Sequence, residues 1–134
     1  MKIAILAAIT FPILFVLDLL WIGLIGNGFY RSELGSLMRA DVLWPAALAF
    51  YVIYCLGIAF FVLSPAIAAH SFNKVLLAAA FFGLIAYATY DLTNLATLNG
   101  WPVFMTFVDL AWGTFVTIVA SSAAYLIATK LLHY

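Results

Sequence analysis

Long apolar runs separated by short polar segments make up most of this chain, and their lengths predict membrane-spanning helices. A helix needs about 20 apolar residues to cross the hydrocarbon core of a bilayer. Four runs reach this length, at about residues 3–25, 44–63, 75–98 and 102–129. The pattern therefore predicts an all-α, polytopic membrane protein, with residues 1–134 forming a single four-helix transmembrane domain.

The polar segments between these runs differ in length, and this difference constrains the connections. Asn99-Gly100-Trp101 is a tight turn before Pro102, a residue suited to the first turn of a helix. The third and fourth spans are therefore expected to be antiparallel neighbours. The longest connection covers residues 27–43, where apolar positions recur at helical spacing and Arg31 and Arg39 fall largely elsewhere. This segment predicts a short interfacial helix between the first two spans.

Composition supports the membrane assignment and excludes a nucleic-acid-binding protein and a disulfide-stabilised one. The chain is 69% hydrophobic and 7% charged, whereas soluble domains carry about 25% charged residues. The formal net charge is zero, so no basic surface is available for nucleic acid. The single cysteine, Cys55, excludes an intrachain disulfide.

Basic residues are distributed unevenly between the two ends of the predicted bundle. Lys2, Lys74 and Lys130 fall on the side that holds both termini, and Arg31 and Arg39 fall on the other side. Cytoplasmic loops carry the excess of Lys and Arg in membrane proteins. Both termini are therefore predicted to be cytoplasmic.

Three of the five acidic residues, Asp18, Asp91 and Asp109, lie inside the predicted spans. Ionisable groups at this depth are costly, so they point into the bundle and mark a functional site or a buried pair. At 1.5 Å per residue, they lie roughly 13, 12 and 10 Å from the same, non-terminal side of the membrane. We expect one layer of carboxylates, with a residue of the second span between Tyr51 and Tyr54 at a comparable depth.

Further polar and aromatic residues fall at helical spacing from these carboxylates. The candidate ligand-binding residues are Asp18, Trp21, Tyr87, Asp91, Asn94, Asp109 and Trp112. Three interpretations stay open: contacts that only fix helix register, a polar cavity for a ligand, or a site for a divalent metal. Because the layer holds no His and the spacing is not diagnostic, we predict no metal and assign no cofactor.

A weak internal repeat bears on the architecture. Asp18-Leu19 precedes Asn27-Gly28-Phe29, and Asp91-Leu92 precedes Asn99-Gly100-Trp101 at nearly the same offset. The repeat is either a coincidence in a chain rich in Leu and aromatic residues or the trace of two parallel two-helix halves. The second interpretation is typical of transporters.

Several segments together are similar to those of a known family. They are Asp18 to Trp21, Ile25 to Tyr30, Leu34 to Arg39, Tyr87 to Pro102 and Asp109 to Thr114. The chain resembles the small bacterial membrane proteins called domain of unknown function 2177 over nearly its whole length, and Tyr87 to Pro102 is the specific part. The resemblance implies a four-helix protein of the bacterial inner membrane and supplies no activity.

We expect a small inner-membrane protein that binds a lipid or another apolar ligand around the carboxylate layer. One alternative is a small proton-coupled transporter in which carboxylates exchange protons for a cation. Another is a lipid-modifying enzyme that uses one Asp as acid and another as base, so enzymatic activity stays open. The bilayer is the expected surrounding, and homo-oligomerisation would enlarge a cavity in so small a bundle.

Overall fold

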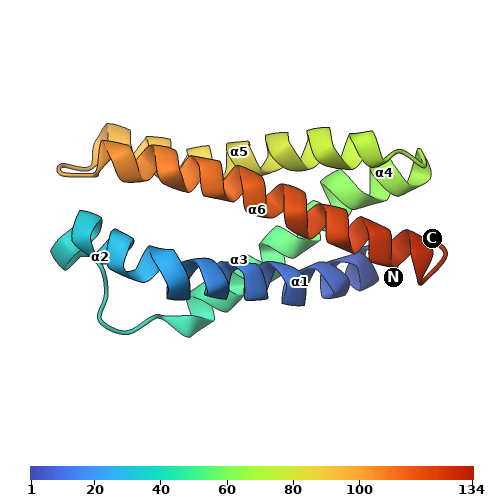
Figure 1. Cartoon of the computed structure of the whole chain (residues 1–134), viewed down its shortest axis with the longest axis horizontal. Coiled ribbons are helices and arrows are strands. Elements are labelled where there is room, and N and C mark those ends of the chain that lie inside the picture. The colour runs from blue at the N-terminus through green and yellow to red at the C-terminus, as the bar shows by residue number, and fades with distance from the viewer.

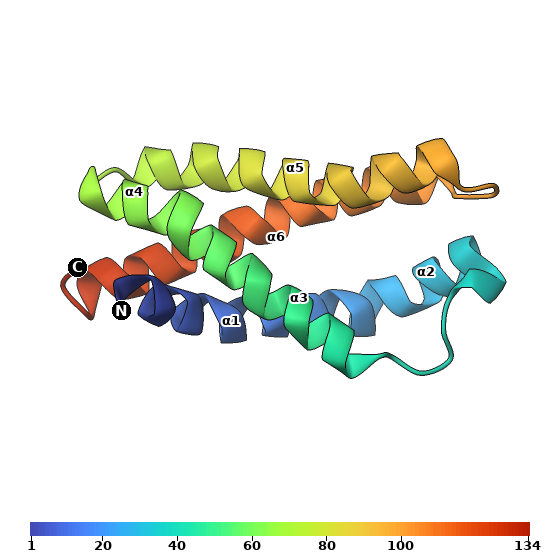
Figure 2. The same ribbon diagram turned by 180° about the vertical axis from the view of Figure 1, so that it is seen from behind.

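The computed structural model describes residues 1–134 as helices joined by short connections, without strands (Figure 1). Four helical runs are long and apolar enough to cross a membrane: Lys2–Leu37, Trp44–Ala68, Phe72–Thr97 and Val103–Lys130. The predicted all-α, polytopic fold class is therefore confirmed. Both termini lie at one end of the bundle, as an even number of spans requires (Figures 1 and 2).

The first run is longer than its apolar pattern predicts. Helix α1 (Lys2–Trp21) passes through a π-helical segment, Ile22–Gly26, into α2 (Asn27–Leu34), and a 3₁₀ turn follows at Gly35–Leu37. The predicted separate interfacial helix is not confirmed, because its residues continue the first helix without a break. The chain leaves the α-helix only at Gly35, whose φ of +56° is a left-handed conformation that glycine adopts without strain.

The second run also extends past its predicted end. Helix α3 (Trp44–Gly57) continues through a π-helical segment, Ile58–Leu63, into α4 (Ser64–Ala68). Pro65 was expected to follow the end of this span, yet it occupies the first turn of α4. Proline lacks a backbone N–H and is tolerated at a first turn, and the preceding π-helical segment provides such a position here.

The last two runs form a close antiparallel hairpin. Helix α5 (Phe72–Thr97) and helix α6 (Val103–Lys130) lie side by side in both views (Figures 1 and 2). Glycine permits their approach: a Cβ atom added at Gly83 would lie 2.7 Å from the backbone oxygen of Gly113 and 2.7 Å from Thr117 Oγ1. Small residues allow helices to pack closely in lipid, where burial from water does not drive their association.

The half of the bundle near the termini has a close-packed interior. Helices α1, α5 and α6 and the π-helical segment Ile58–Leu63 contribute to it, and its residues are almost fully buried. We call it the closed half and define it by Leu6, Val62, Leu63, Val75, Ala120, Ala124 and Ala128. These side chains are all aliphatic, so van der Waals packing holds this half together.

Candidate functional site

The other half of the bundle, which we call the open half, has a polar interior. It is defined by Asp18, Trp21, Tyr30, Tyr51, Asp91, Asp109 and Trp112. Helices α1, α2, α3, α5 and α6 each supply at least one of these side chains. The predicted depth of the carboxylates accounts for their location in this half, away from the termini.

Asp18 receives a hydrogen bond on each of its two carboxylate oxygens. The hydroxyl of Tyr51 donates to Oδ2 at 2.5 Å, and Nε1 of Trp112 donates to Oδ1 at 3.0 Å. The first contact agrees with the depth predicted for Tyr51. Because hydrogen bonds to a carboxylate are stronger than neutral ones, Asp18 ties α1 firmly to α3 and α6.

Asp109 is held by a chain of donors that begins on the first helix. Nε1 of Trp21 donates to the hydroxyl of Tyr30 at 3.1 Å, and this hydroxyl donates to Oδ1 of Asp109 at 2.7 Å. Trp21 also stacks on Trp112, with ring centroids 4.4 Å apart. The carboxylates of α1 and α6 are thus linked through a layer of aromatic side chains.

Tyr30 reaches this layer because of the π-helical segment that precedes α2. In a continuous α-helix, residues nine apart differ by about two and a half turns and lie on opposite faces. A π-helical turn holds about one residue more, which returns Tyr30 to within about a quarter turn of Trp21. Gly26 leaves the space that the ring needs, since a Cβ atom there would lie 2.9 Å from Cε2 of Tyr30.

The packing of α5 against α6 places Asp91 opposite Asp109. Gly83 faces Thr117, and Tyr87 faces Gly113 one helical turn further along. One further helical turn along α5 and one turn back along α6 bring Asp91 toward Asp109. Asp91 is completely buried, and neither of its oxygens has a donor from any other residue.

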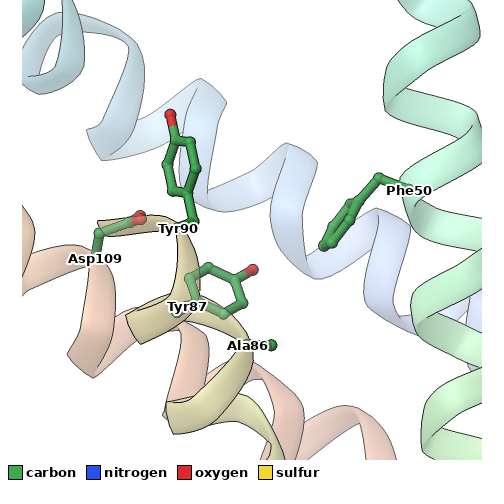
Figure 3. Close-up of a pocket in the computed structure, with 5 residues that line it drawn as sticks. All are labelled: Phe50, Ala86, Tyr87, Tyr90 and Asp109. Atoms are coloured by element: carbon green, nitrogen blue, oxygen red, sulfur yellow. The ribbon is translucent and has the colours of Figure 1, made fainter. Parts of the chain in front are cut away.

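Two adjoining cavities open beside this pair. One has a volume of about 340 Å³ and the other about 300 Å³, and both are lined by Tyr87, Tyr90 and Asp109. Phe50 and Ala86 complete the wall of the larger cavity (Figure 3). The smaller cavity extends to α1 and α2. Apolar walls with a few convergent polar groups are typical of small-molecule sites.

The cavities bring together most of the residues predicted from the sequence. Five of the seven line the smaller cavity: Asp18, Trp21, Tyr87, Asp109 and Trp112. Asp91 is buried behind Asp109, and Asn94 lines neither cavity.

Among the aromatic residues that line the cavities, sequence reasoning missed Tyr90, Phe50 and Tyr30. Tyr90 is adjacent to Asp91 in the chain, so helical spacing assigns the two residues to different faces. Phe50 is one of many aromatic residues in an apolar run, and nothing local distinguishes it. Tyr30 was assigned to the interfacial helix, although Gly23 and Gly26 beside it are the kind of residues at which a helix departs from α geometry.

The site is acidic in composition, because the carboxyl groups of Asp18 and Asp109 line the cavities. No Lys or Arg lines either cavity. Arg31 donates to Oδ1 of Asn27 at 2.9 Å, and Arg39 donates to the carbonyl oxygen of Asp41 at 3.3 Å. No group of three His, Cys, Asp or Glu side chains is arranged to hold a metal ion.

The fold and the site together define a multi-pass α-helical membrane protein with an acidic, aromatic cavity in one half of its bundle. Residues 3–126 match the family described as "Predicted membrane protein (DUF2177)", and the chain belongs to this family. The resemblance seen in the sequence is thereby confirmed. Comparisons with curated proteins and with solved structures gave no match.

Proposed function

We propose that this membrane protein binds an amphipathic ligand, such as a lipid, in the adjoining cavities of the open half. The observation that carries the proposal is the convergence of Tyr87, Tyr90 and Asp109 on a space with otherwise apolar walls. A ligand with a polar head and an apolar body matches both parts of this lining.

The tyrosine hydroxyls support a polar contact with the ligand. Those of Tyr30, Tyr51 and Tyr54 are hydrogen-bonded to other side chains. Those of Tyr87 and Tyr90 have no partner in the protein and line the cavities. An unsatisfied polar group is costly in hydrocarbon, so a ligand that bonds to these hydroxyls would be favoured there.

The outer rim of the smaller cavity suggests a route of entry. Leu34, Met38 and Val42 line it, and all three come from the end of α2 and the connection to α3. Val42 is 58% exposed, and this connection is the longest in the chain. Such a segment can move aside at low cost, so we propose that the ligand enters past it from the surrounding bilayer.

We further propose that the protein lies in a bacterial inner membrane with both termini in the cytoplasm. Lys2, Lys74 and Lys130 lie at the end that holds the termini, against Arg31 and Arg39 at the other end. This excess favours a cytoplasmic location for the terminal end. Cysteine-accessibility labelling of spheroplasts, with a single cysteine placed at either end, tests the orientation.

Native mass spectrometry of the protein purified in a maltoside detergent tests ligand binding. The natural protein is expected to retain a lipid or lipid-sized molecule. Ala86→Trp should lose it, because Ala86 lines the larger cavity and an indole would fill much of the space. Ala96→Trp is the matched control, since Ala96 lies exposed on the same helix. Equal retention by the two variants, or no retained molecule in the natural protein, would contradict the proposal.

A further inference from the structure

The lining of the larger cavity combines a carboxylate with aromatic rings. Phe50 comes from α3, Tyr87 and Tyr90 come from α5, and Asp109 comes from α6 (Figure 3). Phe50 and Tyr87 project into the space from facing helices. Aromatic faces attract cations through their quadrupole, and the attraction grows when water is excluded. Rings around a carboxylate are therefore suited to an organic ammonium group.

The carboxyl pair behind the cavity adds an independent observation. Asp91 is fully buried, and neither of its carboxyl oxygens has a hydrogen-bond partner. An ionised carboxylate without a donor is costly at full burial, whereas a protonated Asp91 has a hydrogen to donate toward Asp109. Asp109 already accepts a hydrogen bond from Tyr30, whereas Asp91 accepts none. Placing the proton on Asp91 gives the Asp109 carboxyl group a second donor.

The remaining titratable groups around the pair do not change this arrangement. Asp18 of α1 already receives two hydrogen bonds from other residues. Tyr30 of α2 is the donor to Asp109, and Tyr87 and Tyr90 of α5 are neutral hydroxyls. Helix α3 faces the cavity with Phe50. A cation bound here would therefore meet the Asp109 carboxyl group and no competing positive charge.

We propose that the open half binds the ammonium group of an amphipathic organic cation, held between Asp109 and the rings of Phe50, Tyr87 and Tyr90. The buried Asp91 carries a proton and donates it in a hydrogen bond that holds the Asp109 carboxylate in position. The inference rests on the proposed function and specifies the charge of the ligand. No covalent step is involved, and the proton stays on Asp91 when the cation binds.

Two detergent-like probes that differ mainly in charge test this inference on the whole protein in maltoside micelles. Dodecyltrimethylammonium is cationic, and dodecyldimethylamine N-oxide is neutral with the same chain length. Binding is followed by the intrinsic fluorescence of the tryptophans. Two of them, Trp21 and Trp112, line the adjoining smaller cavity. The cation is expected to bind saturably and at least about tenfold more tightly than the N-oxide, a difference of about 1.4 kcal/mol.

Variants of the two carboxyl groups separate their roles. Asp109→Asn should abolish the preference for the cation, because it removes the charge that the ammonium meets. Asp91→Asn should retain the preference within about threefold, because an amide still donates to Asp109. Loss of the preference in Asp91→Asn and its retention in Asp109→Asn would overturn the inference.

The Asp→Asn variants could fail to fold, so a further variant tests the site with both carboxyl groups intact. Phe50→Leu should weaken binding of the cation several-fold and leave binding of the N-oxide nearly unchanged. Phe60→Leu is its control, since Phe60 lies exposed further along the same helical run and lines neither cavity. Equal effects of Phe50→Leu on both probes would count against the aromatic contact with the cation.

The outcomes distinguish this inference from the proposed function. Equal, saturable binding of both probes overturns the ammonium assignment and leaves amphiphile binding intact. Saturable binding of neither probe, with no lipid retained by the natural protein, overturns both. Competition by short-chain phosphatidylethanolamine but not by phosphatidylglycerol would identify a lipid head group as the source of the ammonium. Competition by neither lipid would identify a free organic cation, and both results support the shared chemistry.

Discussion

The closed and open halves are built from the same four helical runs, yet their interiors differ in kind. The closed half buries aliphatic side chains such as Leu6, Val75 and Ala124 against one another. The open half buries Asp18 and Asp91 and joins its helices through hydrogen bonds between side chains. Hydrogen bonds fix helices at a few points without filling the space between them. The comparison indicates that packing in one half supports a cavity in the other.

The largest expected effect comes from disturbing the glycine contact that sets the distance between α5 and α6. Gly83→Ala places a Cβ atom 2.7 Å from a backbone oxygen of α6, so the two helices must separate. We expect a loss of about 3 kcal/mol or more, at the upper end of overpacking effects. Thermal unfolding in maltoside micelles, followed by circular dichroism, measures it.

Gly28→Ala is the matched control for that variant. Gly28 lies in α2, where a Cβ atom meets nothing within 4 Å, and alanine favours a helix over glycine by about 0.5–1 kcal/mol. The control should therefore unfold at the same temperature as the natural protein or slightly above it. If the two glycine variants lowered the unfolding temperature equally, the close approach at Gly83 would not be what stabilises the hairpin.

A pair of leucine truncations compares the two interiors directly. Leu6 is fully buried in the closed half, so Leu6→Ala should cost about 2–4 kcal/mol through lost contacts and the cavity that it leaves. Leu34 lines a cavity that already exists, so Leu34→Ala should cost less than about 1 kcal/mol. The quantity to measure is the difference between the unfolding free energies of the two variants. A difference near zero would contradict the view that the two halves are packed differently.

Removal of a single hydroxyl probes the polar contacts of the open half. Tyr51→Phe loses the 2.5 Å hydrogen bond to Asp18, and we expect a cost of about 1–2 kcal/mol. Tyr125→Phe is its control in the closed half, because Tyr125 is also buried and its hydroxyl makes no hydrogen bond in the protein. The same unfolding assay should show little change for the control, whereas equal losses would argue that the Asp18 contact adds nothing to stability.

The smallest effect on stability is expected at the wall of the cavities. Tyr90→Phe removes a hydroxyl that has no partner in the protein, so stability should change by less than about 0.5 kcal/mol. Binding of dodecyltrimethylammonium should persist, because the aromatic face remains, while retention of the native ligand should fall if that ligand bonds to the hydroxyl. A large loss of stability would show that this group serves the fold instead.

Much of the architecture follows from the sequence alone because it depends on local quantities. The length of an apolar run decides whether a helix can span a bilayer, and all four spans were predicted on that basis. The tight turn at Gly100 specifies an antiparallel hairpin. The rise per residue places Asp18, Asp91 and Asp109 at one depth, and it places the stretch from Tyr51 to Tyr54 of the second span at a comparable depth.

Only the tertiary structure decided how each helix is rotated about its own axis and which side chains meet. The π-helical segment at Ile22–Gly26 turns Tyr30 toward Asp109, a phase change that an assumed α-helical period cannot reveal. The contact between Gly83 and Gly113 sets the register that places Asp91 against Asp109. The sequence determined the depth of the carboxylates. Packing between helices gave hydrogen-bond donors to Asp18 and Asp109, exposed Asp109 to the cavities and buried Asp91 without a donor.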